Sequence, residues 1–390
     1  MLLARTATTM VELVLVLFAL ERFHSAGLAG AVTFLALAPG LLMSPIVGAL
    51  LDRHGRVKLM VVDYVVAAVA LALIVGLGAS DLLTEAALLA IVTVMSLTFP
   101  LSTTGVRTMF PLIVPRPLWE RANAIDSNGY VVSSIFGPAI AGALVATVGS
   151  LWALALTSAM YLVAAVVTLQ LRDPLGRVPH GALLSDAWAG LVYTWRNASL
   201  RGLGISVSTA NLANGLFFIA LPVLVFSRLG GNAAQVGQLF ALMGVTAAVS
   251  VLTVGRVKTE GRERPLLAGA MLLTGLGYGL VVLSPNLLFA ALAMGLIGLA
   301  TGPFDVVLFT MRQRRTDPAW LGRAFAISMS LNFIGFPVGS ALGGAVAPVS
   351  LELAFVAAMA LDVLAAVLSF VLIPKVHTDP FLAGAAAIED

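Results

Sequence analysis

Four acidic residues lie well inside long apolar stretches, away from the ends, and their type and position could do chemistry. They are Glu12, Asp63, Asp305 and Asp362. A carboxylate within an apolar membrane span is costly, so it is by default a hypothesis for a functional site such as a proton relay. Glu12 lies near the middle of the stretch 2–21, and we take it as the first candidate for a carboxylate that loads and releases a proton. The alternative is a buried acid that is hydrogen-bonded to a neighbour and has no role in turnover.

The other three acids carry separate expectations. Asp305 precedes Arg312 by about two helical turns, so it is either a second proton-carrying carboxylate or a partner for the arginines near it. Asp63 lies one or two turns into the stretch 57–79, and we expect it to pair with arginines of the preceding loop. Asp362 lies near the middle of the stretch 350–373, where we favour structural hydrogen bonding.

Amide, aromatic and Met side chains in other apolar stretches are candidates to line a substrate cavity. They are Asn211, Asn214, Phe217, Phe218, Met243 and Phe304. Amides offer hydrogen bonds, whereas aromatic rings and Met offer an adaptable apolar surface. The alternative for the aromatic and Met side chains is packing between helices or contact with lipid.

The composition indicates the environment in which these residues lie. Of the 390 residues, 60% are hydrophobic and 11% are charged. A soluble domain has about 25% charged and 45–50% apolar residues, so the expected solvent is lipid. There is no Cys, which excludes disulfides, thiolate metal sites and Cys nucleophiles. The net charge of +3 gives no reason to expect a nucleic-acid partner.

Twelve stretches reach the length of about 20 mostly apolar residues that a membrane span needs. They are 2–21, 27–51, 57–79, 86–109, 122–148, 151–171, 202–227, 234–255, 265–284, 287–310, 322–347 and 350–373. We therefore predict an all-α multi-pass membrane protein of two six-helix bundles. The bundles are expected at 1–172 and 202–375, with a cytoplasmic linker at 173–201 and a C-terminal tail at 376–390.

The positions of Lys and Arg set the orientation, because cytoplasmic loops carry an excess of both. With twelve spans and a cytoplasmic N-terminus, all but two of the 22 Lys and Arg residues fall on the cytoplasmic side, the exceptions being Arg22 and Arg228. A wrong span count would scramble this bias for every later loop. We therefore expect both termini in the cytoplasm.

The linker contains the segment "LLSDAWAGLVYTW", in which Leu184, Trp188, Leu191 and Trp195 recur at helical spacing. One interpretation is an amphipathic helix on the cytoplasmic membrane surface, with both Trp at headgroup depth. The other is an ordinary linker helix that packs on the bundle.

An internal repeat relates the two halves. A shift of 202 residues aligns "RANAIDSNGYVVSSIFGPAIAGAL" at 121 with "RAFAISMSLNFIGFPVGSALGGAV" at 323, and it places Glu12 opposite Asn214. Such a repeat implies parallel halves with a substrate site between them near the midplane. Gly335, Gly339 and Gly343 follow one another at intervals of one turn. Small residues at that spacing let helices approach closely, either as static packing or as sliding contacts between the halves.

The two repeated segments also carry a proline each, Pro138 and Pro337. A proline inside a helix removes a backbone hydrogen bond and permits a bend.

Two sequence motifs resemble those of a known family. The segment "GALLDRHGRVKL" after the second span is similar to the loop motif G-x-x-x-D-R-x-G-R-R/K of the major facilitator superfamily, with Gly48, Asp52, Arg53, Gly55 and Arg56 in place. The segment "RTMFPLIVPRPLWERANAIDS", followed by "GPAIAG", resembles the bacterial efflux branch that includes macrolide and enterobactin exporters. Gly137, Pro138 and Gly142 are similar to the antiporter motif of the fifth span.

The resemblance implies that spans one, four, seven and ten line a central cavity. It also implies that the end of the second span meets the start of the eleventh when the cytoplasmic side is closed. A helix C-terminus repels an acid and a helix N-terminus attracts one, so Asp52 would act as a latch that exists in one state only. Arg107 is either part of this cluster or an ordinary membrane anchor. The expected latch consists of Gly48, Asp52, Arg53, Gly55, Arg56, Arg107 and Asp126.

Together these observations favour proton-coupled efflux of amphipathic small molecules by alternating access. An importer or facilitator on the same fold is the alternative, followed by a receptor that does not transport or an intramembrane enzyme. All four His fall in loops, and no metalloprotease, serine-hydrolase or nucleotide-binding motif is present. We expect a monomer in the bacterial inner membrane, with a small-molecule substrate, protons and lipid as partners. The proton gradient is the expected driving force, and no cofactor or metal is expected.

Overall fold

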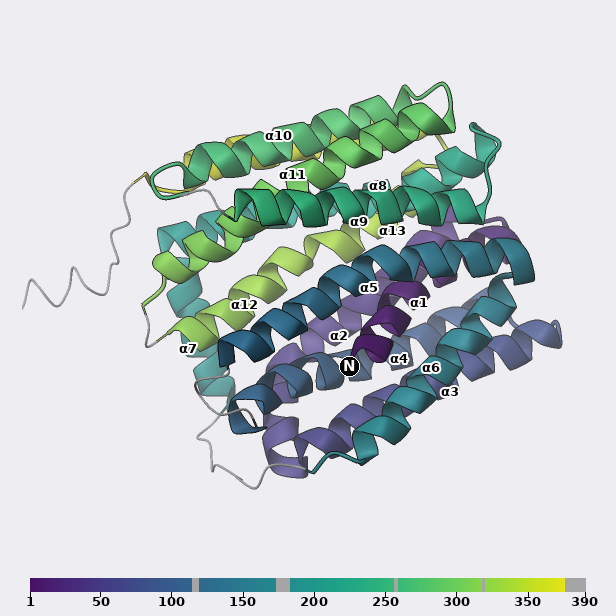
Figure 1. Ribbon diagram of the computed structural model, residues 1–390, viewed down its shortest axis with the longest axis horizontal. Coiled ribbons are helices and arrows are strands. Elements are labelled where there is room, and N and C mark those ends of the chain that lie inside the picture. Colours follow the sequence, from purple (N-terminus) through teal and green to yellow (C-terminus); the bar gives the residue numbers. More distant parts are fainter. Residues whose placement is uncertain (114–118, 173–182, 256–258, 318–319, 376–390) are drawn as a thin grey trace, which may run out of the picture. The chain divides into compact units, whose positions relative to one another are not determined.

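A computed structural model describes residues 1–113, 119–172, 183–255, 259–317 and 320–375. Within these ranges it does not describe the side chains of 44–45, 48–49, 52–53, 107–108, 110–112, 119–128, 183–187 and 321–326. The described residues form helices and no strands (Figure 1). The prediction of an all-α protein is confirmed.

The first six helices match the first six predicted spans. They are α1 (Leu2–Phe23), α2 (Ala26–His54), α3 (Arg56–Ala79), α4 (Glu85–Ile113), α5 (Trp119–Val148) and α6 (Ser150–Leu169). A shorter helix, α7 (Leu183–Arg196), follows. The remaining helices are α8 (Ala198–Ser227), α9 (Ala233–Val254), α10 (Glu263–Val282), α11 (Leu287–Arg314), α12 (Leu321–Phe333), α13 (Gly335–Val346) and α14 (Leu351–Leu372). Twelve segments in the described residues are long and apolar enough to cross a membrane, which confirms the predicted number of spans.

Local sequence explains where several helices begin. Ser25, Asn286 and Ser350 each accept a hydrogen bond from a backbone N–H in the first turn of α2, α11 and α14, as preferred N-cap residues do. Between α2 and α3, Gly55 adopts a positive φ of 92°. That conformation is accessible to glycine at little cost, so Gly55 lets the chain reverse between two spans.

The two prolines of the repeat behave differently. The predicted span 322–347 is divided at Ile334 into α12 and α13. Pro337 explains the division, because its ring clashes with the carbonyl four residues earlier, that of Phe333. Pro138, by contrast, lies within the continuous helix α5.

The chain forms two compact units. Unit 1 consists of Met1–Gly181 and Leu221–Gly244, and unit 2 of Ala182–Ala220 and Val245–Asp390. The domain boundaries expected at 172, 201 and 375 stay a prediction. In unit 1, α1 packs against α2, α5 and α6, while α3 packs against α4 and α6. These contacts place α1 among its neighbours, so polar groups on α1 can meet polar groups from several helices.

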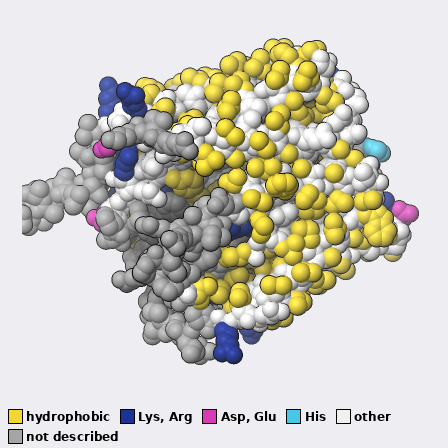
Figure 2. Space-filling view, viewed as in Figure 1, with side chains coloured by type: hydrophobic (Ala, Val, Ile, Leu, Met, Phe, Trp, Pro, Cys, Tyr) yellow, Lys and Arg dark blue, Asp and Glu magenta, His cyan; other side chains and the backbone are white. Residues whose placement is uncertain are grey.

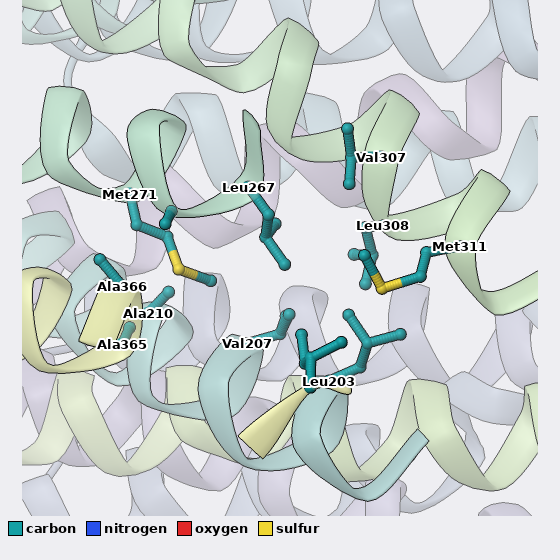
Figure 3. Packing of buried hydrophobic residues seen from close by; sticks show 12 residues of the cluster. Leu203, Val207, Ala210, Leu267, Met271, Val307, Leu308, Met311, Ala365 and Ala366 are labelled. Atoms are coloured by element: carbon teal, nitrogen blue, oxygen red, sulfur yellow. The ribbon is translucent and has the colours of Figure 1, made fainter. Parts of the chain in front are cut away.

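The core of unit 2 forms where α8, α10, α11 and α14 meet. Figure 3 shows side chains of these helices directed toward one another, among them Leu203, Leu267, Met271 and Met311. On the face drawn in Figure 2, hydrophobic side chains cover much of the described surface. An apolar surface over an apolar core is what a lipid solvent allows.

Close approach of helices explains the glycine spacing in α13. A Cβ at Gly335 would overlap the carbonyl oxygen of Ser208, and one at Gly339 would overlap that of Leu212. Gly343 likewise faces Leu216. All three contacts join α13 to α8 inside unit 2, so they are packing contacts within that unit rather than contacts between the halves.

Candidate functional site

Glu12 lines a small cavity inside unit 1. It lies one helical turn after Thr8 on α1, so both side chains are on the same face. Apolar side chains from α1, α2, α3 and α4 form most of the wall, and the polar lining comes from a few groups. The lining residues are Thr8, Val11, Glu12, Leu15, Ala36, Leu37, Asp63, Ala67, Met95, Ser96, Phe99 and Tyr161.

Asp63 brings a second carboxylate to the same cavity, from α3. It is 4% exposed, and Thr98 and Ser102 of α4 hydrogen-bond to its carboxylate. The expected pairing of Asp63 with loop arginines stays a prediction, because the Arg53 side chain lies outside the described residues. Its position near the end of a span in the sequence pointed to the loop, whereas the fold turns it toward hydroxyl groups of the neighbouring helix.

Tyr161 of α6 adds a hydroxyl to the cavity. Its oxygen lies 3.0 Å from Thr8 Oγ1, and Thr8 Oγ1 itself donates to the carbonyl of Ala4 at 3.0 Å. Because a Thr hydroxyl has a single hydrogen to donate, Tyr161 is the donor in the bond to Thr8. Glu12 and Asp63 both interact electrostatically with the Tyr161 phenol, so three helices converge on one polar centre.

The cavity is large enough for water. It offers about 40 Å³ to the centres of water molecules, and one water needs at least about 10–15 Å³ by the same measure. Water beside two carboxylates and a phenol can carry a proton between them. The arrangement can therefore store and move protons inside an apolar unit.

The other acids lie elsewhere. Asp305 of α11 is partly exposed, and it does not line the cavity of unit 1. Asp362 of α14 is buried beside α10, and within the described residues its Oδ2 atom has no hydrogen-bond partner. The structural hydrogen bonding that we favoured for Asp362 is thus missing for that oxygen.

Phe217 lies in the core of unit 2. Its ring is 1% exposed, stacks on Tyr278 at 4.4 Å between centroids, and meets Phe355 edge-on at 5.8 Å. These contacts join α8 to α10 and α14, so the structure assigns Phe217 to packing rather than to a cavity wall. Phe304 also packs against the core of unit 2.

Asn211, Asn214, Phe218 and Met243 differ in their surroundings. The Asn211 side chain donates to the backbone carbonyl of Asn332 at 2.9 Å, which ties α8 to α12. Asn214 is exposed, and its substrate role stays a prediction. Phe218 lies 5.5 Å from Phe336 between ring centroids, and Met243 is half-buried.

A buried arginine in unit 2 was not among the sequence candidates. Arg312 is fully buried in α11, donates to the sulfur of Met329, and donates to the Asn332 side chain in its preferred amide orientation. The sequence offered Arg312 only as a possible partner for Asp305. Together with Asn211, it forms a polar link from α8 through α12 to α11.

Most of the predicted latch lies outside the described side chains. This applies to Gly48, Asp52, Arg53, Arg107 and Asp126. Gly55 makes the turn between α2 and α3, and Arg56 begins α3. The latch therefore stays a prediction.

The antiporter-like motif of α5 lies at close helix contacts. A Cβ at Gly137 would overlap the Thr9 side chain of α1, and one at Gly142 would overlap the carbonyl of Ala233 in α9. Thr9 also donates to the carbonyl of Ser133 at 2.9 Å. The two glycines therefore let α5 approach α1 and α9 within unit 1.

The fold is that of a transporter of known structure. A crystal structure of a variant of the nucleoside transporter NupG superimposes with a TM-score of 0.70, at 14% identity, covering 95% of this chain and 96% of that chain. This likeness and the twelve candidate spans define a multi-pass membrane protein with the fold of that transporter.

The family follows from the sequence comparisons. Residues 19–383 match the family described as transmembrane secretion effector, and the chain belongs to that family. The chain is 37% identical over 375 residues to an uncharacterized transporter of the major facilitator type, y4rN of Sinorhizobium fredii, covering 94% of this chain and 91% of the relative. It is 28% identical over 327 residues to the enterobactin exporter EntS of Escherichia coli, covering 82% and 76%. The resemblance read from the motifs is confirmed, and the family consists of transporters rather than enzymes.

Proposed function

We propose that this transporter exports amphipathic small molecules from the bacterial cytoplasm or inner leaflet in exchange for protons. The observation that carries the proposal is the pair of carboxylates, Glu12 and Asp63, that lines one cavity inside unit 1. A carboxylate pair within membrane spans is a usual component of proton relays. The relative named as an enterobactin exporter supports the outward direction.

The proposed cycle follows from alternating access. Glu12 takes a proton from the outer side when the carrier is open outward, and this neutralises its carboxylate. The neutral carrier reorients, and Glu12 releases the proton to the cytoplasm before substrate binds. Asp63 and water in the cavity exchange protons with Glu12, while the Tyr161 hydroxyl donates to Thr8. A ligand can shift such a conformational equilibrium only by its differential affinity for the two states, and here that ligand is the proton.

The latch is the second part of the proposal. Asp52 lies near the C-terminal end of α2, where the partial charge of the helix dipole is negative. We propose that Asp52 makes a contact in the outward-open state only. This contact compensates the repulsion and stabilises that state. The proposed latch cluster consists of Asp52 together with Arg53, Arg56 and Arg107.

The test uses purified protein in proteoliposomes with a controlled pH gradient. Amphipathic cations such as ethidium and tetraphenylphosphonium serve as transport probes, and a zwitterionic dye is tested as a further probe. Transport that is driven by the pH gradient and collapses with a protonophore supports exchange. A transport rate that does not change with the pH gradient supports the alternative of a facilitator on the same fold.

A further inference from the structure

The helix α7 has one buried face and one exposed face. Tyr193 is 1% exposed, and its neighbours Thr194 and Asn197 are buried as well. Trp188 and Trp195 are 66% and 54% exposed. They are seven residues apart, which is about two helical turns, so they lie on the same face. The described part of α7 therefore presents two large aromatic side chains away from unit 2.

The buried face fixes the orientation of α7. The Tyr193 ring stacks on Trp320 with 5.0 Å between centroids and 5° between planes, and the Tyr193 hydroxyl accepts a hydrogen bond from the backbone of Asp317 at 3.0 Å. Asn197 donates to the carbonyl of Arg315 at 2.9 Å. These contacts tie α7 to the connection between α11 and α12. The exposed Trp face is thus set by the fold and is not a consequence of a loosely attached helix.

The surroundings of α7 locate it at the ends of the spans. Arg315 directly follows α11 and donates to Ser199 at the start of α8 and to Pro374 just after α14. It also lies 3.9 Å from Glu263 at the start of α10. Burial lowers the pKa of Arg315, and the negative charge of Glu263 opposes that shift. Four span ends therefore meet beside α7, which places the helix at the level where the membrane meets water.

Cations outnumber acids in this region of unit 2. Glu263 is engaged with Arg314 at 3.1 Å as well as with Arg315, so its charge is compensated. The described cations at these span ends are Arg196, Arg201, Arg262, Arg264, Arg312, Arg314, Arg315 and Lys375, and the described acids are Glu260, Glu263 and Asp317. Arg312, Arg315 and Glu263 are buried. The cations that are exposed or half-buried form a basic surface, which is complementary to the anionic headgroups of a cytoplasmic leaflet.

We propose that α7 is an interfacial anchor whose Trp188–Trp195 face lies among the headgroups of anionic phospholipids. With 14 residues, α7 is about 21 Å long and too short to cross a membrane. Trp is enriched at membrane interfaces because its ring is apolar and its N–H is polar. Figure 1 shows α7 at the end of unit 2 where α12 begins, running across that end. The two expectations for this segment are compatible, since one face packs on the protein and the other meets lipid. This inference does not depend on the direction or coupling of transport.

The experiment measures how close single tryptophans come to lipid. Three variants of the full chain each keep one Trp, at position 188, 195 or 320, with the remaining Trp residues replaced by Phe. Each variant is reconstituted in nanodiscs with or without phospholipids brominated near the headgroup. Trp188 and Trp195 should lose at least half of their emission to bromolipid and resist aqueous iodide. Trp320, which stacks on Tyr193, is the packed control and should respond little to either quencher.

Two outcomes would overturn the anchor. Strong iodide quenching of Trp188 and Trp195 without bromolipid quenching would show that the face is in water. Protection that rises with the number of protein copies per disc would show that the face binds a second copy of the chain.

A separate comparison of lipid mixtures tests the preference for anionic headgroups. Bromolipid quenching should increase about twofold when phosphatidylglycerol replaces part of the phosphatidylcholine, because an anionic leaflet attracts juxtamembrane arginines. The variant with Arg196→Gln and Arg201→Gln should lose this increase. Equal quenching in both lipid mixtures would contradict the proposed preference for anionic headgroups.

Discussion

Glu12 and Asp63 face the same cavity of unit 1 from two different helices, α1 and α3. The two residues are 51 positions apart in the chain, and only the packing of α1, α3, α4 and α6 brings their carboxylates to one polar centre. This relationship adds Asp63 to Glu12 as a candidate for proton carriage in the cavity of unit 1. It also makes Asp63 a candidate for the proposed proton relay.

Replacing Asp63 should impair coupling more than replacing another buried acid. We expect Asp63→Asn to lower the initial rate of transport driven by the pH gradient by about tenfold or more, because a positioned proton-transfer group contributes roughly 10²–10⁴-fold. The measurement is dye transport in proteoliposomes. Asp362→Asn is the matched control, since Asp362 is equally buried but lies in unit 2 away from the cavity. Equal losses in both variants would mean that burial alone, and not the cavity, explains the effect.

The hydrogen bond between Tyr161 and Thr8 should be measurable by a double-mutant cycle. Tyr161→Phe and Thr8→Val each remove one partner of the 3.0 Å contact. A typical hydrogen bond contributes about 1 kcal/mol net to the free energy of unfolding, and partners in contact are not additive. We expect a coupling free energy of about 1 kcal/mol from chemical unfolding in detergent. If the changes in the free energy of unfolding of the two single variants add up to that of the double variant, the two hydroxyls do not interact.

Gly339 should be intolerant of a methyl group. Gly339→Ala places a Cβ against the backbone carbonyl of Leu212, and overpacking of a well-packed interior costs about 1–3 kcal/mol. Gly269→Ala is the control, because nothing lies within 4 Å of a Cβ there and Ala in a helix is favoured over Gly by about 0.5–1 kcal/mol. Thermal unfolding in one detergent should therefore move in opposite directions for the two variants. Equal melting temperatures would contradict the close contact between α13 and α8.

The latch predicts a shift in conformational populations. An Asp near a helix dipole changes stability by about 0.3–1 kcal/mol, so Asp52→Asn should change the ratio of the two states by about two- to fivefold. The chain has no Cys, and a single Asn214→Cys substitution therefore gives a unique site for maleimide labelling. Labelling from the outer side should slow in the Asp52→Asn background. Asn232→Cys, in the connection between α8 and α9, should label at an unchanged rate, and unchanged labelling at both positions would reject the latch.

The fold could be predicted from the sequence because the features that define it lie within single segments of the chain. Twelve apolar stretches and the distribution of Lys and Arg require no tertiary information, and Pro337 marked the position near which α12 and α13 separate. Pro138 carried the same signal without dividing α5, because the effect of a proline also depends on the packing around it.

The site was predictable only in part. Glu12 was identifiable because an acid in the middle of a span has few harmless explanations. Asp63 was identified as an acid within a span, but its hydroxyl partners, Thr98 and Ser102, come from another helix and could not be read from the sequence. Both a cavity wall and helix packing were open for Phe217, because an aromatic residue in a span has the same sequence signature in either place. Its stacking on Tyr278 could be seen only in the structure.

The most direct measurement of the central claim is proton-driven efflux by the Glu12→Gln variant in everted membrane vesicles. Glu85→Gln is the matched control, since Glu85 is exposed at the start of α4 and does not line the cavity. We expect Glu12→Gln to insert at the level of the unmodified protein and to retain substrate exchange without a pH gradient. Its efflux driven by the gradient should fall to the background of empty vesicles, whereas Glu85→Gln should transport normally. Undiminished gradient-driven efflux by Glu12→Gln would contradict the proposal that this carboxylate carries the coupled proton.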